Sequence, residues 1–344
     1  MSPSFRRLSR RKLLRVAAAA IAAPALHART ASAAARAWRV TGRNIPELAA
    51  FDQTVEGFMR PRGIRSGSLA VTRDGRLVLA RGYSWDDAPD MEVQPTSLFR
   101  IASLSKPLTS AAIMQLVQSA NLSLSAPITS LLELSPSSGR SRESRLDQIT
   151  VLQLLQHLGG WDRDRSFDPM FYDSAIRRAL GIGLPVRIDD IITYMAGQPL
   201  DHAPGSGYYY SNFGYALLGR VIERVAGSGY EAWLKQALLS PLGIRRMRMG
   251  RSVLQDRAPG EVKYESTYTA TTVISGSGAT VPSPYGGFNL ENMAAHGAWL
   301  ASAVDLADGQ ARGVRILAIS ERRATPPAGM RRPRIMSRIT VSGH

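Results

Sequence analysis

The hydrophobic pattern predicts a helix followed by a hairpin near the start of the chain. Apolar residues recur every three or four positions across residues 46–59, at Leu48, Phe51, Val55 and Phe58. This spacing places them on one face of an amphipathic helix. Two β-type runs, Ser68–Thr72 and Arg76–Arg81, then flank Asp74-Gly75, a pair favoured in tight turns.

The pattern then becomes mainly helical. The stretch from Leu98 to Leu122 predicts a helix whose core positions are Ile113, Leu116 and Val117, with Pro107 early enough to be tolerated in the first turn. Further helices are predicted over Ile149–His157, over Phe213–Val225 ending at Gly227, and over Tyr230–Leu239 ending at Pro241. Strands, then helices, then an expected return to strands indicate an α+β fold with a helical subdomain at about residues 125–260.

Composition limits the possible functions. The 344 residues can bury a sizeable core in one large domain or two smaller ones. The net charge of +16 is concentrated at the ends: residues 1–33 carry +7, residues 307–344 carry +6, and residues 34–306 carry +3. The body therefore lacks the basic surface that a nucleic-acid partner requires. Cysteine is absent, which excludes disulfides, a thiol nucleophile and thiolate metal ligands.

The N-terminal segment has the composition of an export signal. Ser9-Arg10-Arg11-Lys12-Leu13-Leu14 resembles a twin-arginine start, and an apolar run over residues 16–26 follows it. Ala31-Ser32-Ala33 offers small residues for signal peptidase, so residues 1–33 are expected to be removed on export. The run is shorter than the ~20 apolar residues that span a bilayer, so no stable membrane span is expected in the mature protein. A membrane anchor and export by the Sec route are the alternatives.

The candidate nucleophile lies at the start of the helix predicted after residue 98. Ser103-Leu104-Ser105-Lys106 fits the pattern S-x-x-K, and residues three apart on a helix lie about 4.5 Å apart along its axis on nearly one face. The amine can therefore help to remove the proton of a serine that is otherwise a poor nucleophile. Lysine is scarce among the 43 basic residues, and its pKa, unlike that of arginine, can fall far enough for proton transfer. The alternative is a solvated lysine at a helix start.

A second candidate element is Tyr210-Ser211-Asn212, the only Y-x-N in the sequence, which precedes a predicted helix. A tyrosine held beside a lysine cation can accept and donate protons during acyl transfer. An asparagine amide can hold the lysine and orient a substrate amide. The alternative is an aromatic loop in which Asn212 is the N-cap of the helix, and the two interpretations are compatible.

These segments carry a family resemblance. Phe99–Lys106 resembles the nucleophile segment of class C β-lactamases, family VIII esterases and D-alanyl-D-alanine peptidases, and the run from Pro204 to Gly219 resembles their second motif. Other matching positions are Ile149-Thr150-Val151, His157, Gly159-Gly160-Trp161, Leu239, Pro241, Leu242 and Gly243. The resemblance spans roughly residues 46–306. It implies a β-lactamase/transpeptidase-like fold, with an antiparallel sheet flanked by helices. It also implies an acyl-enzyme mechanism in which Ser103 attacks, Tyr210 and Lys106 manage its proton, and Asn212 supports them.

One part of the family pattern is missing. The resemblance implies a third motif, Lys or His, any residue, then Gly, on a C-terminal strand that helps to form the oxyanion hole. Lys263 is followed by Tyr264-Glu265, and His296-Gly297 lacks the spacing. Residues 307–344 are rich in arginine and contain no Phe, Trp or Tyr, with one candidate strand at 313–319. We therefore predict a frameshift near residue 307, with loss of the C-terminal strands; a divergent C-terminus is the alternative. The loss would expose a sheet edge, so impaired turnover or folding is expected.

The sequence thus predicts an exported serine hydrolase, periplasmic or secreted, with a domain over residues 34–306. Its expected substrates are small esters, β-lactams or D-amino-acid peptides, and the sequence does not choose among them or indicate an oligomeric state. No cofactor or metal is expected, because the five histidines form no H-E-x-x-H pair and His157 fits a structural role. G-x-S-x-G and Gly-rich phosphate loops are also absent. The alternative is a non-catalytic relic of the family that binds ligand or peptidoglycan without turnover.

Overall fold

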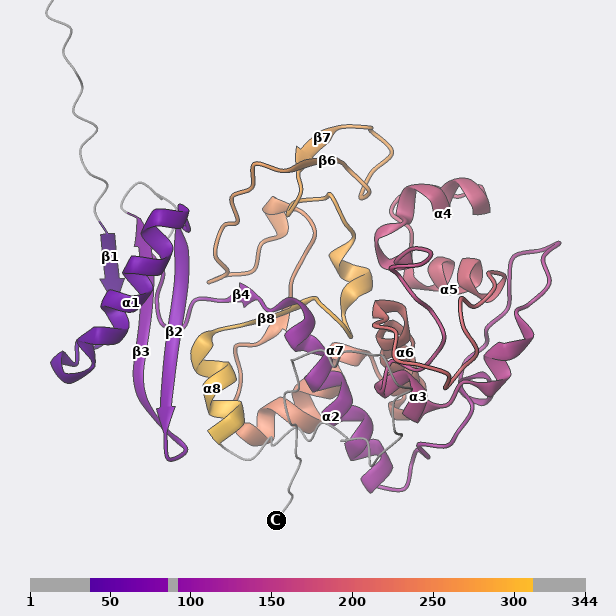
Figure 1. The fold of residues 1–344 in the computed structure, drawn as a ribbon, viewed down its shortest axis with the longest axis horizontal. Coiled ribbons are helices and arrows are strands. Elements are labelled where there is room, and N and C mark those ends of the chain that lie inside the picture. Colours follow the sequence, from indigo (N-terminus) through magenta and orange to yellow (C-terminus); the bar gives the residue numbers. More distant parts are fainter. Residues whose placement is uncertain (1–37, 86–91, 312–344) are drawn as a thin grey trace, which may run out of the picture. The chain divides into compact units, whose positions relative to one another are not determined.

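The computed structural model describes residues 38–85 and 92–311, which all fall within one of the two units of the chain, residues 37–344. Figure 1 shows the order of the elements. The helices are α1 Ala49–Met59, α2 Ser105–Gln118, α3 Val151–Leu155, α4 Asp173–Leu180, α5 Ile188–Ala196, α6 Asn212–Ala226, α7 Tyr230–Leu234 and α8 Ala303–Ala311. The strands are β1 Trp38–Thr41, β2 Ser66–Arg73, β3 Arg76–Trp85, β4 Phe99–Arg100, β5 Arg248–Met249, β6 Thr269–Thr271, β7 Thr280–Pro282 and β8 Trp299–Ala301. The predicted leader and the candidate strand at 313–319 lie outside the described residues.

The predicted hairpin is confirmed and is longer than the pattern indicated. β2 and β3 are antiparallel, and β1 pairs with the other side of β3, so the order is β1-β3-β2. Asp74 and Gly75 have φ values of 51° and 72°, which match the two left-handed positions of a type I′ turn. The turn sets the pairing register, in which Arg73 lies opposite Arg76.

The predicted first helix is also confirmed, but polar contacts join it to the sheet. Arg81 on β3 donates from Nε and Nη2 to the two carboxylate oxygens of Asp52 on α1, at 3.0 and 2.7 Å. Tyr83 Oη lies 2.7 Å from the same carboxylate, and Tyr83 is fully buried. The bidentate bond to Arg81 holds the pKa of Asp52 below its usual value. Phe51 and Phe58, which have the apolar helical spacing, are exposed instead.

Two further small antiparallel sheets complete the strands of the described region. β8 lies between β4 and β5, and β6 pairs with β7. Because β4 leads directly into the S-x-x-K segment, its pairing with β8 fixes the backbone on which the candidate nucleophile sits. α8 follows β8 and packs on β2 and β3. It crosses the predicted boundary at residue 307 and runs to Ala311.

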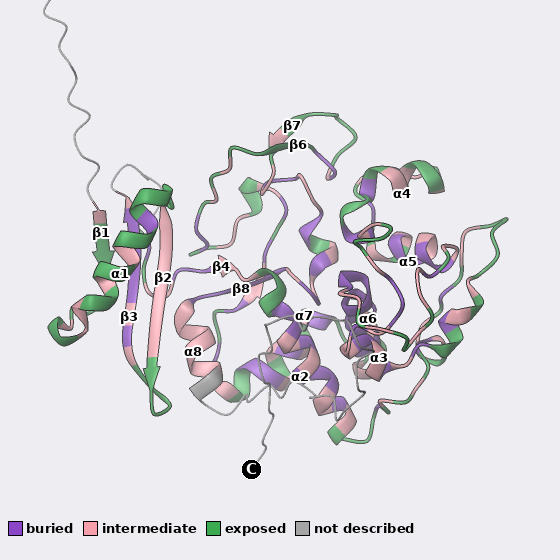
Figure 2. Cartoon of the chain, viewed as in Figure 1, coloured by how far each residue is buried: buried purple, intermediate pink, exposed green. Residues whose placement is uncertain are grey.

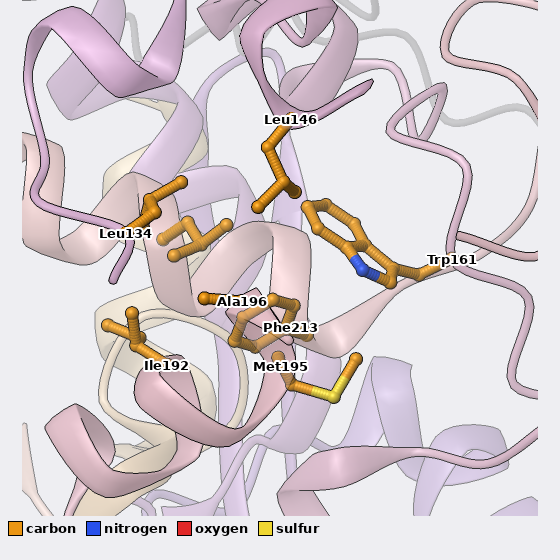
Figure 3. Close-up of a pocket in the computed structure, with 8 residues that line it drawn as sticks. Leu134, Leu146, Trp161, Ile192, Met195, Ala196 and Phe213 are labelled. Atoms are coloured by element: carbon orange, nitrogen blue, oxygen red, sulfur yellow. The ribbon is translucent and has the colours of Figure 1, made fainter. Parts of the chain in front are cut away.

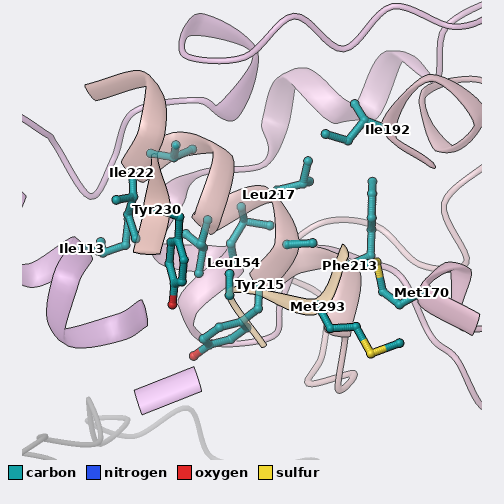
Figure 4. Close-up of a cluster of buried hydrophobic side chains, with 14 of the residues drawn as sticks. Ile113, Leu154, Met170, Ile192, Phe213, Tyr215, Leu217, Ile222, Tyr230 and Met293 are labelled. Carbon is teal, nitrogen blue, oxygen red and sulfur yellow. The ribbon is translucent and has the colours of Figure 1, made fainter. Parts of the chain in front are cut away.

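The hydrophobic core lies mainly in the predicted helical subdomain and is centred on α6. Ten of the fifteen residues of α6 are buried, which is typical of a helix surrounded by other elements (Figures 2 and 4). Ser211 caps the start of α6 by accepting from Gly214 N at 3.1 Å, and Gly227, with a φ of 67°, ends it. A Cβ at Gly219 would lie 2.7 Å from Ala295 Cβ, so glycine allows segment 294–298 to approach α6 closely.

The core contains a cavity of about 10 Å³. It is bordered by Leu134, Leu146, Trp161, Ile192, Met195, Ala196, Phe213 and Leu217 (Figure 3). Trp161 Nε1 is a buried donor with no hydrogen-bond partner. A water held here would need several polar partners, so this apolar space is a packing defect and not a ligand site. In residues 38–85 and 92–311, no helix is both long and apolar enough to cross a membrane.

Candidate active site

The candidate nucleophile lies on a tight turn between β4 and α2. Residues Ala102–Leu104 form a 3₁₀ turn, and α2 begins immediately afterwards at Ser105. Ala102, just before Ser103, has a φ of 46°, a left-handed conformation that costs a non-glycine residue about 1–2 kcal/mol. The turn is held because Ile101 N donates to Trp299 O on β8 at 3.0 Å and Leu104 N donates to Ile101 O at 3.0 Å. The result is an exposed Ser103 at the N-terminal end of α2.

The structure brings together the four residues predicted from the two sequence motifs. Ser103 Oγ lies 2.7 Å from Tyr210 Oη, although 107 residues separate them. Lys106 Nζ donates to Ser103 Oγ at 3.3 Å and to Asn212 Oδ1 at 2.7 Å. A hydroxyl, an amine and a phenol therefore form one continuous hydrogen-bonded group, which can carry a proton away from the serine oxygen.

Lys106 is buried, and its surroundings shift its acidity. It is 5% exposed, and besides Ser103 and Asn212 its amine donates to the carbonyl of His296 at 3.2 Å. Burial lowers the pKa of Lys106 to about 7, the charge of Asp168 raises it, and the charge of Arg163 lowers it further. Near neutral pH, a substantial fraction of Lys106 is thus unprotonated and able to accept a proton.

Asn212 is the first residue of α6, and Ser211 is the N-cap of this helix. The alternative prediction that Asn212 is the N-cap is therefore wrong. The Asn212 amide lies between two polar groups. Its Oδ1 accepts from Lys106, and its Nδ2 donates to Asp168 Oδ2 at 2.6 Å. Because the capping task falls to Ser211, the side chain of Asn212 is free to contact the lysine.

Tyr210 is enclosed by aromatic and cationic groups. Lys106 Nζ lies 4.6 Å from the centre of its ring, and the Arg163 guanidinium carbon lies 4.8 Å from it. The His157 ring packs on Tyr210 with 4.6 Å between ring centres. These contacts hold the phenol beside Ser103, since Tyr210 itself lies in an irregular segment just before α6.

His157 has the structural role predicted for it. It lies beyond the end of α3 with a φ of 60°, and its Nδ1 accepts from Ser211 N at 3.1 Å. Burial lowers the pKa of His157 to about 3, and the nearby charge of Lys106 adds to this effect. The ring is therefore neutral at physiological pH and anchors the backbone next to Tyr210.

Sequence reasoning missed three features of the site. Three neighbours of Lys106 belong to neither motif: Asp168, Arg163 and the carbonyl of His296. The sequence shows only that His296-Gly297 lacks the spacing of the third motif, and the close packing of segment 294–298 on Gly219 is what brings the His296 carbonyl to the lysine. Asp168 precedes Pro169, which is a turn signal, but nothing in the sequence connects it to Asn212. Among residues 38–85 and 92–311, no cluster of three or more His, Asp or Glu could hold a metal.

Comparisons with known proteins agree with the expected family and fold. The family model described as Beta-lactamase matches residues 51–333. The esterase EstB of Burkholderia gladioli is 31% identical over 205 residues, covering 57% of this chain and 49% of EstB. Protein flp of Staphylococcus aureus strain MRSA252 is 27% identical over 192 residues, covering 56% of this chain and 36% of flp. This chain thus aligns with a third to a half of the length of these curated relatives.

A solved structure shares the fold. The octameric penicillin-binding protein homologue from Pyrococcus abyssi superposes with a TM-score of 0.55 at 25% identity, covering 77% of this chain and 56% of that one. The expected fold, with helices around small antiparallel sheets, is confirmed, although the strands within residues 38–85 and 92–311 form three separate sheets instead of one. The family match also extends past residue 306, where the resemblance was expected to fade.

Proposed function

The chain belongs to the Beta-lactamase family, and we propose that it is a serine hydrolase that forms an acyl-enzyme on Ser103. The observation that carries the proposal is the geometry of one exposed hydroxyl. Ser103 Oγ lies 2.7 Å from Tyr210 Oη and 3.3 Å from Lys106 Nζ, whose pKa is lowered to about 7. These are the contacts that an activated serine nucleophile requires.

In the proposed reaction, Ser103 Oγ attacks the carbonyl carbon of an ester and its proton passes to the Tyr210–Lys106 pair. The carbon–oxygen bond to the leaving group then breaks, and the same pair returns the proton to the leaving alkoxide. Water, deprotonated by this pair, attacks the acyl-enzyme and releases the acid, and the proton returns to Ser103. The N-terminal end of α2 favours negative charge on the carbonyl oxygen during both attacks.

Small esters with apolar acyl groups are the proposed substrates. Two large apolar side chains near Ser103 and its hydrogen-bonded partners are exposed: Leu104 is 57% exposed and Tyr208 is 59% exposed. Tyr208 packs edge-on against His157, which in turn packs on Tyr210. The similarity to an esterase supports the same substrate class. The β-lactams and D-amino-acid peptides remain the other candidates of this family.

A trapping experiment tests the acyl-enzyme. The protein is mixed with p-nitrophenyl butyrate, quenched in acid and digested, and the peptide that contains Ser103 is weighed by mass spectrometry. We expect a butyryl adduct on Ser103, because Ser103 is the exposed hydroxyl of the hydrogen-bonded group. A parallel reaction with a chromogenic cephalosporin compares the two substrate classes, and we expect faster acylation by the ester.

The same experiment separates the hydrolase from the non-catalytic relic. A relic leaves Ser103 unmodified by the ester and by a fluorophosphonate probe, while circular dichroism shows that the protein is folded. An adduct on any serine other than Ser103 contradicts the proposed nucleophile.

Export is proposed from the leader, which lies outside the described residues. The support is the twin-arginine-like start over residues 9–14 and the small residues at Ala31-Ser32-Ala33. When the full chain is expressed in a bacterium with both export routes, we expect a periplasmic product whose N-terminal sequence begins near residue 34. A cytoplasmic product that keeps its leader contradicts this expectation.

A further inference from the structure

The amide of Asn212 has its two ends in contact with groups of opposite charge. Its Oδ1 is 2.7 Å from the amine of Lys106, and its Nδ2 is 2.6 Å from the carboxylate of Asp168. The amine only donates hydrogen bonds and the ionised carboxylate only accepts them. The two partners together therefore allow a single orientation of the amide.

Asp168 is itself held in place by the core. Its Oδ1 accepts from Met170 N at 3.1 Å, which caps the 3₁₀ turn Pro169–Phe171. Pro169 and Met170 are buried, and the turn packs against α6, whose first residue is Asn212. One carboxylate oxygen thus fixes Asp168 to the turn while the other meets the amide. The position of Asp168 therefore depends on the buried packing of this turn against α6.

We propose that Asp168 is a positioning residue, which fixes the Asn212 amide so that Oδ1 faces Lys106 and holds the amine against Ser103. The inference rests on the proposed function and adds a residue to it. Without the carboxylate, the amide can rotate and place its NH₂ group against the lysine, where two donors would face each other. The amine would then lose its 2.7 Å acceptor and its fixed distance from Ser103 Oγ.

Several other groups lie near Lys106, and their charges affect its pKa and therefore the pH dependence of the activity. Arg163 contributes a positive charge and Asp168 a negative one, and the two act on the pKa of Lys106 in opposite directions. His157 and His296 lie nearby, and burial lowers the pKa of both, so neither changes charge near pH 7. Tyr210 and Tyr215 place their rings at 4.6 and 5.6 Å from the amine. Loss of the charge at Asp168 should therefore move the titration of Lys106 to lower pH.

Asp168→Asn is the decisive variant. Its remaining carbonyl oxygen can still cap Met170, whereas its NH₂ group now meets Nδ2 of Asn212, so the capping role is kept and the orienting role is lost. We expect kcat for p-nitrophenyl butyrate to fall about 10–100-fold with little change in KM, as for other groups that orient a reacting residue. The rising limb of the pH profile should move to lower pH, and Asp168→Glu should recover part of the activity.

A double-mutant cycle shows whether Asp168 acts through Asn212. We expect Asp168→Asn to have almost no further effect on kcat once Asn212 is replaced by alanine, because the amide that it orients is gone. Glu143→Gln is the matched control, since Glu143 also caps a 3₁₀ turn but bonds to Arg145 and the Leu200 backbone. It should leave kcat and the pH profile unchanged.

The outcomes distinguish this inference from the proposed function. If the unsubstituted protein forms no adduct at Ser103, the proposed function fails and the inference falls with it. If that adduct forms but Asp168→Asn keeps the normal kcat and pH profile, only the inference fails. Additive effects in the cycle also overturn it. If Asp168→Asn does not fold, Asp168→Ser decides, because serine can still cap Met170 N but cannot reach the Asn212 amide. A fall in kcat with the rising limb moved to lower pH supports the inference, and an unchanged kcat and pH profile contradict it.

Discussion

Replacing Ser103 with alanine is expected to lower kcat/KM for p-nitrophenyl butyrate by about 10⁴-fold or more, which is the scale found when a nucleophile is removed from a serine hydrolase. The substitution deletes the oxygen that lies 2.7 Å from Tyr210 Oη and leaves the phenol and Lys106 in place. Because Ser103 is exposed, its removal should change the unfolding temperature little. The measurements are initial rates, labelling by a fluorophosphonate probe and thermal unfolding.

The matched control lies two residues away in the same motif. Ser105 is fully buried, and its Oγ accepts from Trp299 N at 3.3 Å, so it connects α2 to β8. Ser105→Ala should leave probe labelling at Ser103 intact but reduce the free energy of unfolding by about 1–3 kcal/mol, because a buried N–H loses its partner. Probe labelling that survives Ser103→Ala would place the nucleophile elsewhere.

Local elements of the fold were predictable where a few neighbouring residues decide the backbone. Asp74-Gly75 sets the turn of the hairpin, Gly227 ends α6, and Pro107 is accommodated in the first turn of α2. Each case depends on the φ preferences of one or two residues, which tertiary packing does not alter. On α1, the spacing of apolar residues does not predict which side chains are buried. Phe51 has the spacing of a core residue but is exposed, whereas the neighbouring Asp52 forms an ion pair with Arg81 on β3.

The site was predictable only along the two motifs. Ser103 and Lys106 are three residues apart, so helical geometry alone brings them together, and the family resemblance supplied Tyr210 and Asn212. Asp168 could not be selected, since its link to Asn212 depends on how the turn Pro169–Phe171 packs on α6. Contacts between distant segments follow from packing, and a single sequence taken alone carries no signal for them. The predicted C-terminal frameshift concerns residues that lie almost wholly outside the described part and stays a prediction.

Two energetically costly features lie next to the proposed nucleophile Ser103. Ala102 adopts a left-handed backbone, and Lys106 is an amine removed from water. Each destabilises the folded state, and each would serve the proposed reaction: the first exposes Ser103, and the second lowers the pKa of Lys106 to about 7. Features of this kind are expected at sites selected for reactivity and not for stability. They support a working nucleophile over a relic, which has no need to retain them.

Replacing Lys106 with arginine is expected to lower kcat/KM by about 10²–10⁴-fold, the range attributed to general acid–base catalysis. Arginine keeps the positive charge but does not lose its proton in proteins, so it cannot accept one from Ser103. The unsubstituted protein should become more active as pH rises through about 7, because the pKa of Lys106 is lowered to about 7 and the unprotonated amine is the base. Lys106→Arg should lose this limb of the pH profile.

Lys235 provides the control for this exchange. It lies in the turn that continues α7, is partly exposed, and pairs with Glu231 at 2.6 Å. Lys235→Arg preserves that ion pair and should change neither rate nor pH profile. Since a guanidinium is larger than an amine and Lys106 is buried, Lys106→Met is measured alongside, with thermal unfolding recorded for every variant. Activity within a few-fold of normal in Lys106→Arg, with the limb near pH 7 retained, would show that another group accepts the proton of Ser103.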